Sequence, residues 1–239
     1  MQIKALEAII RWIQQEVTQA GATGVIVGIS GGVDSALVGY LAAQAFPHHS
    51  LGVLLPINPD RSDDLADGLE LVQAIGLRHQ VIDLQPEYEQ LRAKLAPLAP
   101  LVAGNLQARL RMSVLYALAQ HHNYLVLGTD NRAEYELGYF TKYGDGGCDL
   151  LPISHLFKSE VFAYAQAVGV PATILAKPPS AGLWPGQTDE GELGFSYNDY
   201  ELFCRNKLTN CTTKARIKQQ IAATAHKRVP VPRFASTKD

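Results

Sequence analysis

The stretch VIVGISGGVDSALVGYLA, residues 25–42, contains the pattern that decides the fold. It begins with apolar, β-branched residues, which are typical of a strand buried on both faces. Glycines follow at once, and the alanine- and leucine-rich run over 35–46 predicts a helix that ends before Pro47. Glycines allow close backbone approach, and a helix N-terminus offers unpaired N–H groups and a partial positive charge. We therefore predict an anion site around Ser30, Gly31 and Gly32.

Asp34 places a carboxylate in this turn, where it would repel a phosphate. The turn lacks the GK[ST] ending of a Walker A loop, and it does not match GxGxxG either. The residues alone leave two interpretations of Asp34 open. It is either a first-turn acid that stabilises the helix dipole, or a ligand of a Mg²⁺ ion that bridges carboxylate and phosphate.

Strand and helix patterns alternate through the first half of the chain. Helical patterns, such as those over 62–76 and 103–123, separate apolar runs that predict strands at 24–29, 50–57, 79–84 and 124–128. This alternation predicts a parallel sheet with helices on both faces and right-handed crossovers. In such a sheet, ligands bind beyond the carboxyl ends of the strands.

The composition of the sequence changes from about Gly138. Two segments, 138–152 and 177–194, are rich in Gly, Pro, Asp and Ser, and long irregular loops in a compact domain are usually functional or mobile. Helical patterns surround them at 158–170, 197–208 and 212–228.

Composition limits the classes of function. The 239 residues are 47% hydrophobic and carry a formal net charge of −2, which predicts one domain over 1–239 and argues against bulk attraction to nucleic acid. The three cysteines are not in metal-type pairs, so we expect a reducing compartment and no disulfides. Neither a signal peptide nor an apolar run of spanning length is present, so we expect a cytoplasmic protein without membrane contact.

Several motifs point to one family. SGGVDS (30–35) resembles the pyrophosphate loop of the N-type ATP pyrophosphatases, which cleave ATP between its α- and β-phosphates and adenylate an oxygen of the acceptor. That motif alone leaves several members open. The remaining motifs, in this order, resemble those of NAD synthetases: GNLQARLRM (104–112), GTDNRAE (128–134), GYFTKYGDGGCDLLP (138–152), KPPSAGL (177–183), GQTDEGELGFSY (186–197) and HKR (226–228).

The resemblance implies a ligase that forms a C–N bond. The nicotinate carboxylate of deamido-NAD would attack the α-phosphorus of ATP as its magnesium complex, and ammonia would then displace AMP to give NAD. The family fold implies a doubly wound α/β architecture of the Rossmann-like, ATP-pyrophosphatase type, with a mainly parallel five-stranded sheet. It also implies a homodimer. Because 239 residues leave no room for a glutamine-hydrolysing domain, we expect ammonia to be used directly.

The resemblance further assigns roles to individual residues. Asp34 and Glu134 would bind Mg²⁺, and these two with Lys158 would be the catalytic groups. ATP would contact Gly28, Ile29, Ser30, Gly31, Gly32, Val33, Asp34, Ser35, Thr129, Lys158 and Ser180. Deamido-NAD would contact Arg109, Lys142, Asp149, His226 and Lys227.

Some of these residues also have structural explanations. Glu134, three residues after Asn131, fits a helix capping box. His226 and Lys227 lie at a predicted helix end, where cations are favourable. Lys158 fits a structural role less well, because a cation at a helix start opposes the dipole. Ordinary surface charge would also account for Arg109, Lys142 and Asp149.

Two rival functions stay open at this point. One is another adenylating enzyme of the same fold, such as the synthetase half of GMP synthetase, against which TKYGDGG (141–147) argues. The other is an ATP-sensing module that binds ATP without releasing pyrophosphate. The pair of candidate metal carboxylates, Asp34 and Glu134, argues against a sensor.

Overall fold

The computed structural model describes residues 2–57, 62–95, 97–180, 182 and 186–234. At its centre lies a parallel sheet in the order β3-β2-β1-β4. Its strands are β1 (Gly24–Gly28), β2 (Ser50–Leu54), β3 (His79–Val81) and β4 (Tyr124–Leu127). The chain moves outward from β1 to β3 and then returns to the other side of β1 as β4. The carboxyl ends of β1 and β4 therefore form the switch point where such sheets bind ligands.

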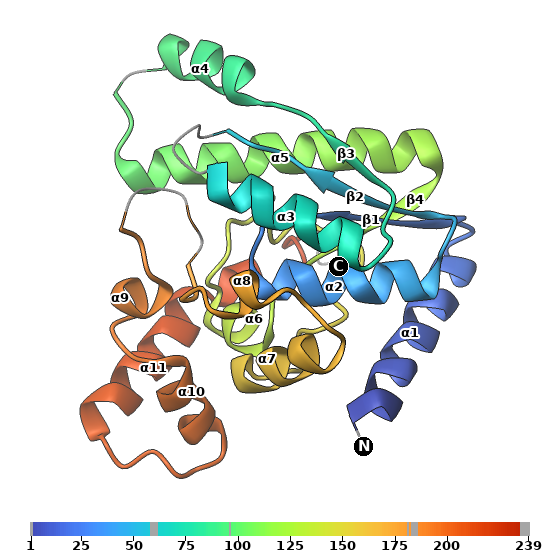
Figure 1. The fold of residues 1–239 in the computed structure, drawn as a ribbon. Coiled ribbons are helices and arrows are strands. Elements are labelled where there is room, and N and C mark those ends of the chain that lie inside the picture. Colours follow the sequence, from blue (N-terminus) through green and yellow to red (C-terminus); the bar gives the residue numbers. More distant parts are fainter. Residues whose placement is uncertain (1, 58–61, 96, 181, 183–185, 235–239) are drawn as a thin grey trace, which may run out of the picture.

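Helices cover both faces of the sheet (Figure 1). One face packs against α1 (Gln2–Gln19), α2 (Val33–Ala45), α3 (Ser62–Ala74) and α7 (Lys158–Ala167). The other face packs against α5 (Pro100–His122), which runs along the sheet, and α4 (Gln85–Lys94) lies beyond it. Val25 and Val27 enter the first apolar cluster and Ile26 enters the second. The predicted α/β architecture, with β1 buried on both faces, is confirmed.

The number of strands differs from the expected five. Within the described residues the sheet has four strands, and the fifth position beside β4 is a single parallel bridge between Leu127 and Leu150. The backbone N–H groups of Asp149 and Leu150 donate to the Val126 carbonyl, and the Gly128 N–H donates to the Leu150 carbonyl. Pro152, two residues after Leu150, has no N–H to extend the ladder. The pairing therefore stops after two residues.

The second half of the chain forms a helical layer beside the carboxyl ends of the strands. It comprises α6 (Arg132–Leu137), α8 (Ala172–Leu175), α9 (Asp189–Leu193), α10 (Tyr197–Cys204), α11 (Cys211–Ala223) and the 3₁₀ turn η2 (Ala225–Lys227). A third apolar cluster, with Leu137, Tyr200 and Ile217 fully buried, joins α6, α10 and α11. Among the described residues, no helix has both the length and the apolar character that crossing a membrane requires.

The predicted helix over 212–228 is interrupted near its end. The hydroxyl of Thr224 donates to the carbonyls of Leu137 and Gln220, and the chain tightens into η2. Hydroxyl bonds to a preceding carbonyl often bend helices. The break places Lys227 against α6 and the segment that follows it.

Candidate active site

A cavity of about 520 Å³ opens at the carboxyl ends of β1 and β4. Its walls come from the turn between β1 and α2, the segment between β4 and α6, residues 138–145, the first residue of α7, and the loop before α9. This volume is typical of a small-molecule site. The cavity occupies the place predicted from the strand pattern.

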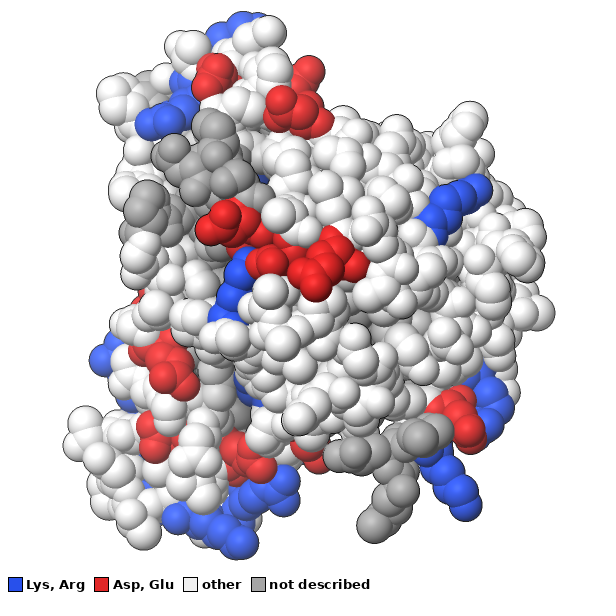
Figure 2. All heavy atoms as spheres, in the orientation of Figure 1, with Lys and Arg blue, Asp and Glu red and all other residues white. Residues whose placement is uncertain are grey.

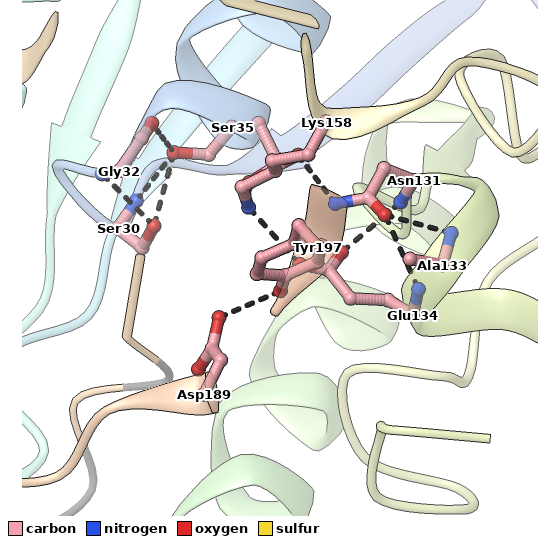
Figure 3. Close-up of polar contacts among 10 residues, drawn as sticks. Ser30, Gly32, Ser35, Asn131, Ala133, Glu134, Lys158, Asp189 and Tyr197 are labelled. Atoms are coloured by element: carbon pink, nitrogen blue, oxygen red, sulfur yellow. Dashed lines mark hydrogen bonds and ion pairs between the residues drawn. The ribbon is translucent and has the colours of Figure 1, made fainter. Parts of the chain in front are cut away.

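The turn between β1 and α2 is held in shape by its own serines (Figure 3). Ser35 Oγ accepts a hydrogen bond from the Ser30 N–H at 3.2 Å, and it donates to the Gly32 carbonyl at 2.9 Å. Gly31 has a φ of +79°, and a Cβ there would lie 2.5 Å from the Asp64 carbonyl oxygen. Gly32 is the N-cap of α2 and supplies no capping side chain. The first N–H groups of α2 can therefore bind an anion.

A buried ion cluster lies beside this turn. Lys158 Nζ is 2.6 Å from Asp34 Oδ2 and 3.2 Å from Glu134 Oε1. Asn131 Nδ2 donates to the other oxygen of Asp34 at 3.0 Å. Only 7% of the Lys158 side chain is exposed. The structure thus brings together three of the predicted site residues, at positions 34, 134 and 158.

Glu134 forms the capping box that the sequence predicted and also contacts the ion cluster. Its Oε2 accepts from the Asn131 N–H at 3.0 Å, and Asn131 Oδ1 accepts from the N–H groups of Ala133 and Glu134, which completes a capping box. Its Oε1 faces Lys158. The cap therefore fixes the carboxylate while leaving one oxygen directed at the ion cluster.

Burial and neighbouring charge perturb both partners. Burial, together with the charge of Asp34, raises the pKa of Glu134 to about 7. Burial alone would lower the pKa of Lys158, but the adjacent carboxylates Asp34 and Glu134 raise it above its usual range. Two acids share one ammonium group, so the cluster attracts a further cation. Perturbed groups in a cavity are candidates for a functional site.

The donor chemistry of the cluster fits Mg²⁺. Carboxylate oxygens of Asp34 and Glu134 bind the same Nζ, so one small cation can reach both. The described residues contain no group of three or more His, Cys, Asp or Glu side chains placed to hold a metal. Mg²⁺ is commonly bound by one or two carboxylates, with substrate phosphates and water completing its shell. Two carboxylates next to a phosphate loop satisfy that requirement.

Two further acids, Asp130 and Asp145, line the same cavity. Asp130 is 5% exposed, and its Oδ2 has no hydrogen-bond partner in the described part of the chain. Burial, followed by the charge of Asp145, raises the pKa of Asp130 well above its usual range. Lys227 Nζ lies nearby and donates to the carbonyls of Gly138 and Phe140 at 2.7 and 2.6 Å. Asp130 and Asp145 lie inside two of the family motifs, yet the sequence alone marks neither of them as a site residue.

The predicted ATP contacts gather in the cavity, whereas most predicted deamido-NAD contacts do not. Cavity-lining predicted residues are Gly28, Ile29, Ser30, Gly31, Gly32, Val33, Asp34, Ser35, Thr129, Glu134, Lys158, Ser180 and Lys227. Arg109, Lys142 and His226 do not line the cavity but are bonded to one another. Arg109 Nε donates to the Lys142 carbonyl, and Lys142 Nζ donates to the His226 carbonyl. Asp149 accepts from the Tyr116 hydroxyl and the Val126 N–H at the sheet edge.

The loop before α9 is tied to α3 and is also bonded across itself. Lys177 pairs with Asp64, at 2.9 Å, and with Asp67, both on α3. Figure 2 shows acidic side chains gathered over α3 on this face, with a basic side chain beside them. Ser180 Oγ donates to the Gln187 carbonyl at 2.7 Å. The Lys177 pairs place the loop beside α3, whose Asp64 backbone lies next to Gly31.

Comparison with known proteins identifies a matching family. The model of the family described as NAD synthase matches residues 5–231. The chain is 50% identical to the NH(3)-dependent NAD(+) synthetase of Mycoplasmopsis pulmonis (strain UAB CTIP), over 92% of this chain and 86% of the relative. It is 44% identical to that of Alkaliphilus metalliredigens (strain QYMF), over 95% and 96% of the two chains.

Solved structures agree in fold. The NMN synthetase from Francisella tularensis superposes with a TM-score of 0.90 at 38% identity, covering 98% of this chain and 99% of that chain. The NH3-dependent NAD synthetase from Campylobacter jejuni superposes with a TM-score of 0.84 at 28% identity, covering 99% and 100%.

Proposed function

Because the chain belongs to the NAD synthase family, we propose that the cavity beyond β1 and β4 is its active site. The chain is a ligase that forms a C–N bond: it amidates deamido-NAD with ammonia and uses ATP, giving NAD, AMP and pyrophosphate. The observation that carries the location of the site is the buried Asp34–Lys158–Glu134 cluster against the SGGVDS turn.

The chemistry follows from charge. The acceptor carboxylate is a poor electrophile until it is adenylated, and adenylation separates the pyrophosphate from the α-phosphorus of ATP. The N–H groups at the start of α2 and the ammonium of Lys158 stabilise the negative charge that develops on the departing phosphates. The cavity is lined by the predicted ATP contacts Thr129 and Ser180, which bind ATP in this proposal.

Mg²⁺ is the proposed cofactor, with Asp34 and Glu134 as its protein ligands. When bound, it would neutralise charge on the phosphate oxygens of ATP. Support comes from the paired carboxylates, whose oxygens lie within 3.2 Å of one shared cation. Lys158 would then turn from these carboxylates toward the phosphates.

Deamido-NAD is proposed to extend from the cavity toward Lys227, Lys142, Arg109, His226 and Asp149. Lys227 lines the cavity, and Lys142, Arg109 and His226 form a bonded row beyond it. A dinucleotide is longer than the part of the site that the cavity encloses, so contacts outside the lining suit it. Asp149 would have to release the Tyr116 hydroxyl and the Val126 N–H before it could contact deamido-NAD.

The chain is proposed to act as a homodimer in the cytoplasm and to fold as one domain. Exposed apolar side chains on and beside α4 and α5 suit a protein interface: Leu91, Leu95, Leu101, Val102 and Tyr116. The free cysteines, Cys148, Cys204 and Cys211, suit a reducing compartment.

The similarity to an NMN synthetase favours a second candidate substrate. The nicotinate mononucleotide carries the same reacting carboxylate as deamido-NAD but lacks its AMP half. The chain is 38% identical to that enzyme over nearly the full length of both. Adenylation and amidation would proceed in the same cavity with either substrate.

Pyrophosphate release from Mg-ATP tests the function. Deamido-NAD, nicotinate mononucleotide and ammonium are added singly and in pairs, and the products are identified by mass. We expect release that requires deamido-NAD, with NAD formed when ammonium is present and no full turnover with glutamine. Higher kcat/KM for the mononucleotide would move the activity to the second candidate. Binding of ATP without acceptor-dependent release would contradict both.

A further inference from the structure

Tyr197, for which the sequence predicts no role, lies between Lys158, Glu134 and Asp189 (Figure 3). Its hydroxyl lies 3.1 Å from Glu134 Oε1 and 2.7 Å from Asp189 Oδ2. Lys158 Nζ lies 4.8 Å from the centre of its ring. One side chain thus touches three charged groups, and 9% of it is exposed.

The two carboxylates that Tyr197 contacts belong to different parts of the site. Glu134 lies on α6 and takes part in the ion cluster. Asp189 is the first residue of α9 and follows the loop that contains Ser180 and Gln187. Asp189 is 3% exposed and lines the cavity. Tyr197 is therefore a bridge between the cluster and the segment that borders the nucleotide cavity.

The position of Tyr197 is fixed independently of this bridge. It is the first residue of α10, whose N-cap Ser196 forms a capping box with Asp199. Its own N–H donates to Glu190 Oε1 at 3.0 Å. The backbone thus holds the ring in place, and the hydroxyl is directed at the two acids.

We propose that Tyr197 is a positioning residue for the adenylation step, acting on Glu134 and Lys158 and through Asp189. Its hydroxyl shares its single proton between Asp189 Oδ2 and Glu134 Oε1, so it holds the α9 segment against the cluster and sets the direction of Glu134, and its ring limits where Lys158 Nζ can lie. This inference rests on the proposed function, because it takes Asp34 and Glu134 as ligands of Mg²⁺. Partners that orient metal ligands contribute about 10- to 100-fold in metal affinity or activity.

Tyr197→Phe removes only the hydroxyl, and Tyr200→Phe is its matched control. Tyr200 lies one turn later on α10, is 1% exposed, and also bonds a carboxylate, but that carboxylate is Glu136, which is not part of the ion cluster. We expect Tyr197→Phe to lower kcat, and to weaken Mn²⁺ binding in the presence of ATP, each by about 10- to 100-fold. Mn²⁺ affinity is read by electron paramagnetic resonance, so it is measured without turnover. Tyr200→Phe should leave Mn²⁺ affinity unchanged.

A double-variant comparison separates bridging from simple loss of packing. If Tyr197 acts through Asp189, Tyr197→Phe combined with Asp189→Ala should be no worse than the more damaged single variant. Multiplied effects, or a Tyr197→Phe protein with the Mn²⁺ affinity and kcat of Tyr200→Phe, would overturn the proposal. Absence of deamido-NAD-dependent turnover in the unaltered chain would instead count against the proposed function, because the Mn²⁺ titration needs no acceptor.

Discussion

Lys158 and Asp34 form a buried ion pair, with 2.6 Å between Nζ and Oδ2, at the place where the proposed Mg²⁺ ion would bind. Residues 34 and 158 lie on different helices, α2 and α7, which pack against each other. The same Nζ also reaches Glu134. In the proposed function, lysine and Mg²⁺ would therefore compete for one pair of carboxylates before ATP arrives.

Replacing Lys158 with Met should reveal that competition. Without its cation the buried acid pair destabilises the metal-free protein by about 3–5 kcal/mol, because two carboxylates are left unpaired. Added Mg²⁺ should then raise the melting temperature more than it does in the unaltered chain, while turnover falls at least about 100-fold. Thermal scans with and without Mg²⁺, alongside a pyrophosphate assay, measure both. Arg205→Met, which breaks a surface pair with Glu201, is the control; an equal Mg²⁺ response in the two variants would contradict the competition.

Asp34→Asn and Glu134→Gln test the metal ligands while keeping side-chain shape. Each removes one negative charge from the proposed Mg²⁺ site, so we expect turnover to fall at least about 100-fold. Circular dichroism should stay unchanged. Glu136→Gln is the matched control, since its carboxylate bonds Arg132 on the same helix, α6. Near-normal rates in both site variants would remove the metal assignment.

Ser35→Ala should loosen the turn between β1 and α2. The substitution deletes the Oγ that accepts from Ser30 and donates to Gly32, which costs about 1 kcal/mol of stability. We expect KM for ATP to rise several-fold and kcat to change less, because the turn must be ordered on binding. Steady-state kinetics at varied ATP provide the measurement. Ser113→Ala, which loses a bond to the Arg109 carbonyl on α5, should leave KM for ATP unaltered, and a rise there equal to that of Ser35→Ala would refute the explanation.

The buried carboxyl of Asp130 should make the metal-free protein less stable as pH rises. Its pKa is raised in the folded state, so between the unfolded and folded pKa values the native protein binds more protons than the unfolded chain. The stability that this group contributes is fully present below its unfolded pKa of about 4 and is lost as pH rises through its folded pKa. Asp130→Asn should flatten the decline in urea midpoints measured from pH 5 to 8. Parallel curves for the two proteins would show that Asp130 does not titrate in this way.

Local sequence pattern was sufficient to predict the sheet and the turn between β1 and α2. β-branched runs marked the strands, and glycines before an alanine-rich run marked the start of α2. The strand count was not obtained, because whether 149–150 pairs with β4 depends on Pro152 and on Asp149 turning back to the Val126 N–H. That contact joins residues 23 apart.

The partners of Asp34 that were predicted came from the family resemblance and not from local pattern. Glu134 and Lys158 came from the family resemblance, and the fold then placed both beside Asp34. Tyr197 ends the 186–197 motif, but a buried tyrosine is indistinguishable from a core residue until its hydroxyl is seen to face Glu134, 63 residues earlier. That Asp130 Oδ2 lacks a hydrogen-bond partner could not be predicted either, because it depends on how the side chain is buried and not on residue spacing.

The single bridge at Leu150 also bears on how copies of this chain meet in solution. The Asp149 side chain accepts from the Val126 N–H, the backbone N–H groups of Asp149 and Leu150 donate to the Val126 carbonyl, and the Leu150 carbonyl accepts from the Gly128 N–H. An uncovered edge strand offers such groups to another molecule and invites strand-to-strand aggregation. Two residues and one carboxylate therefore blunt that edge of the sheet, and substitutions at Asp149 should promote misassembly independently of any effect on substrate binding.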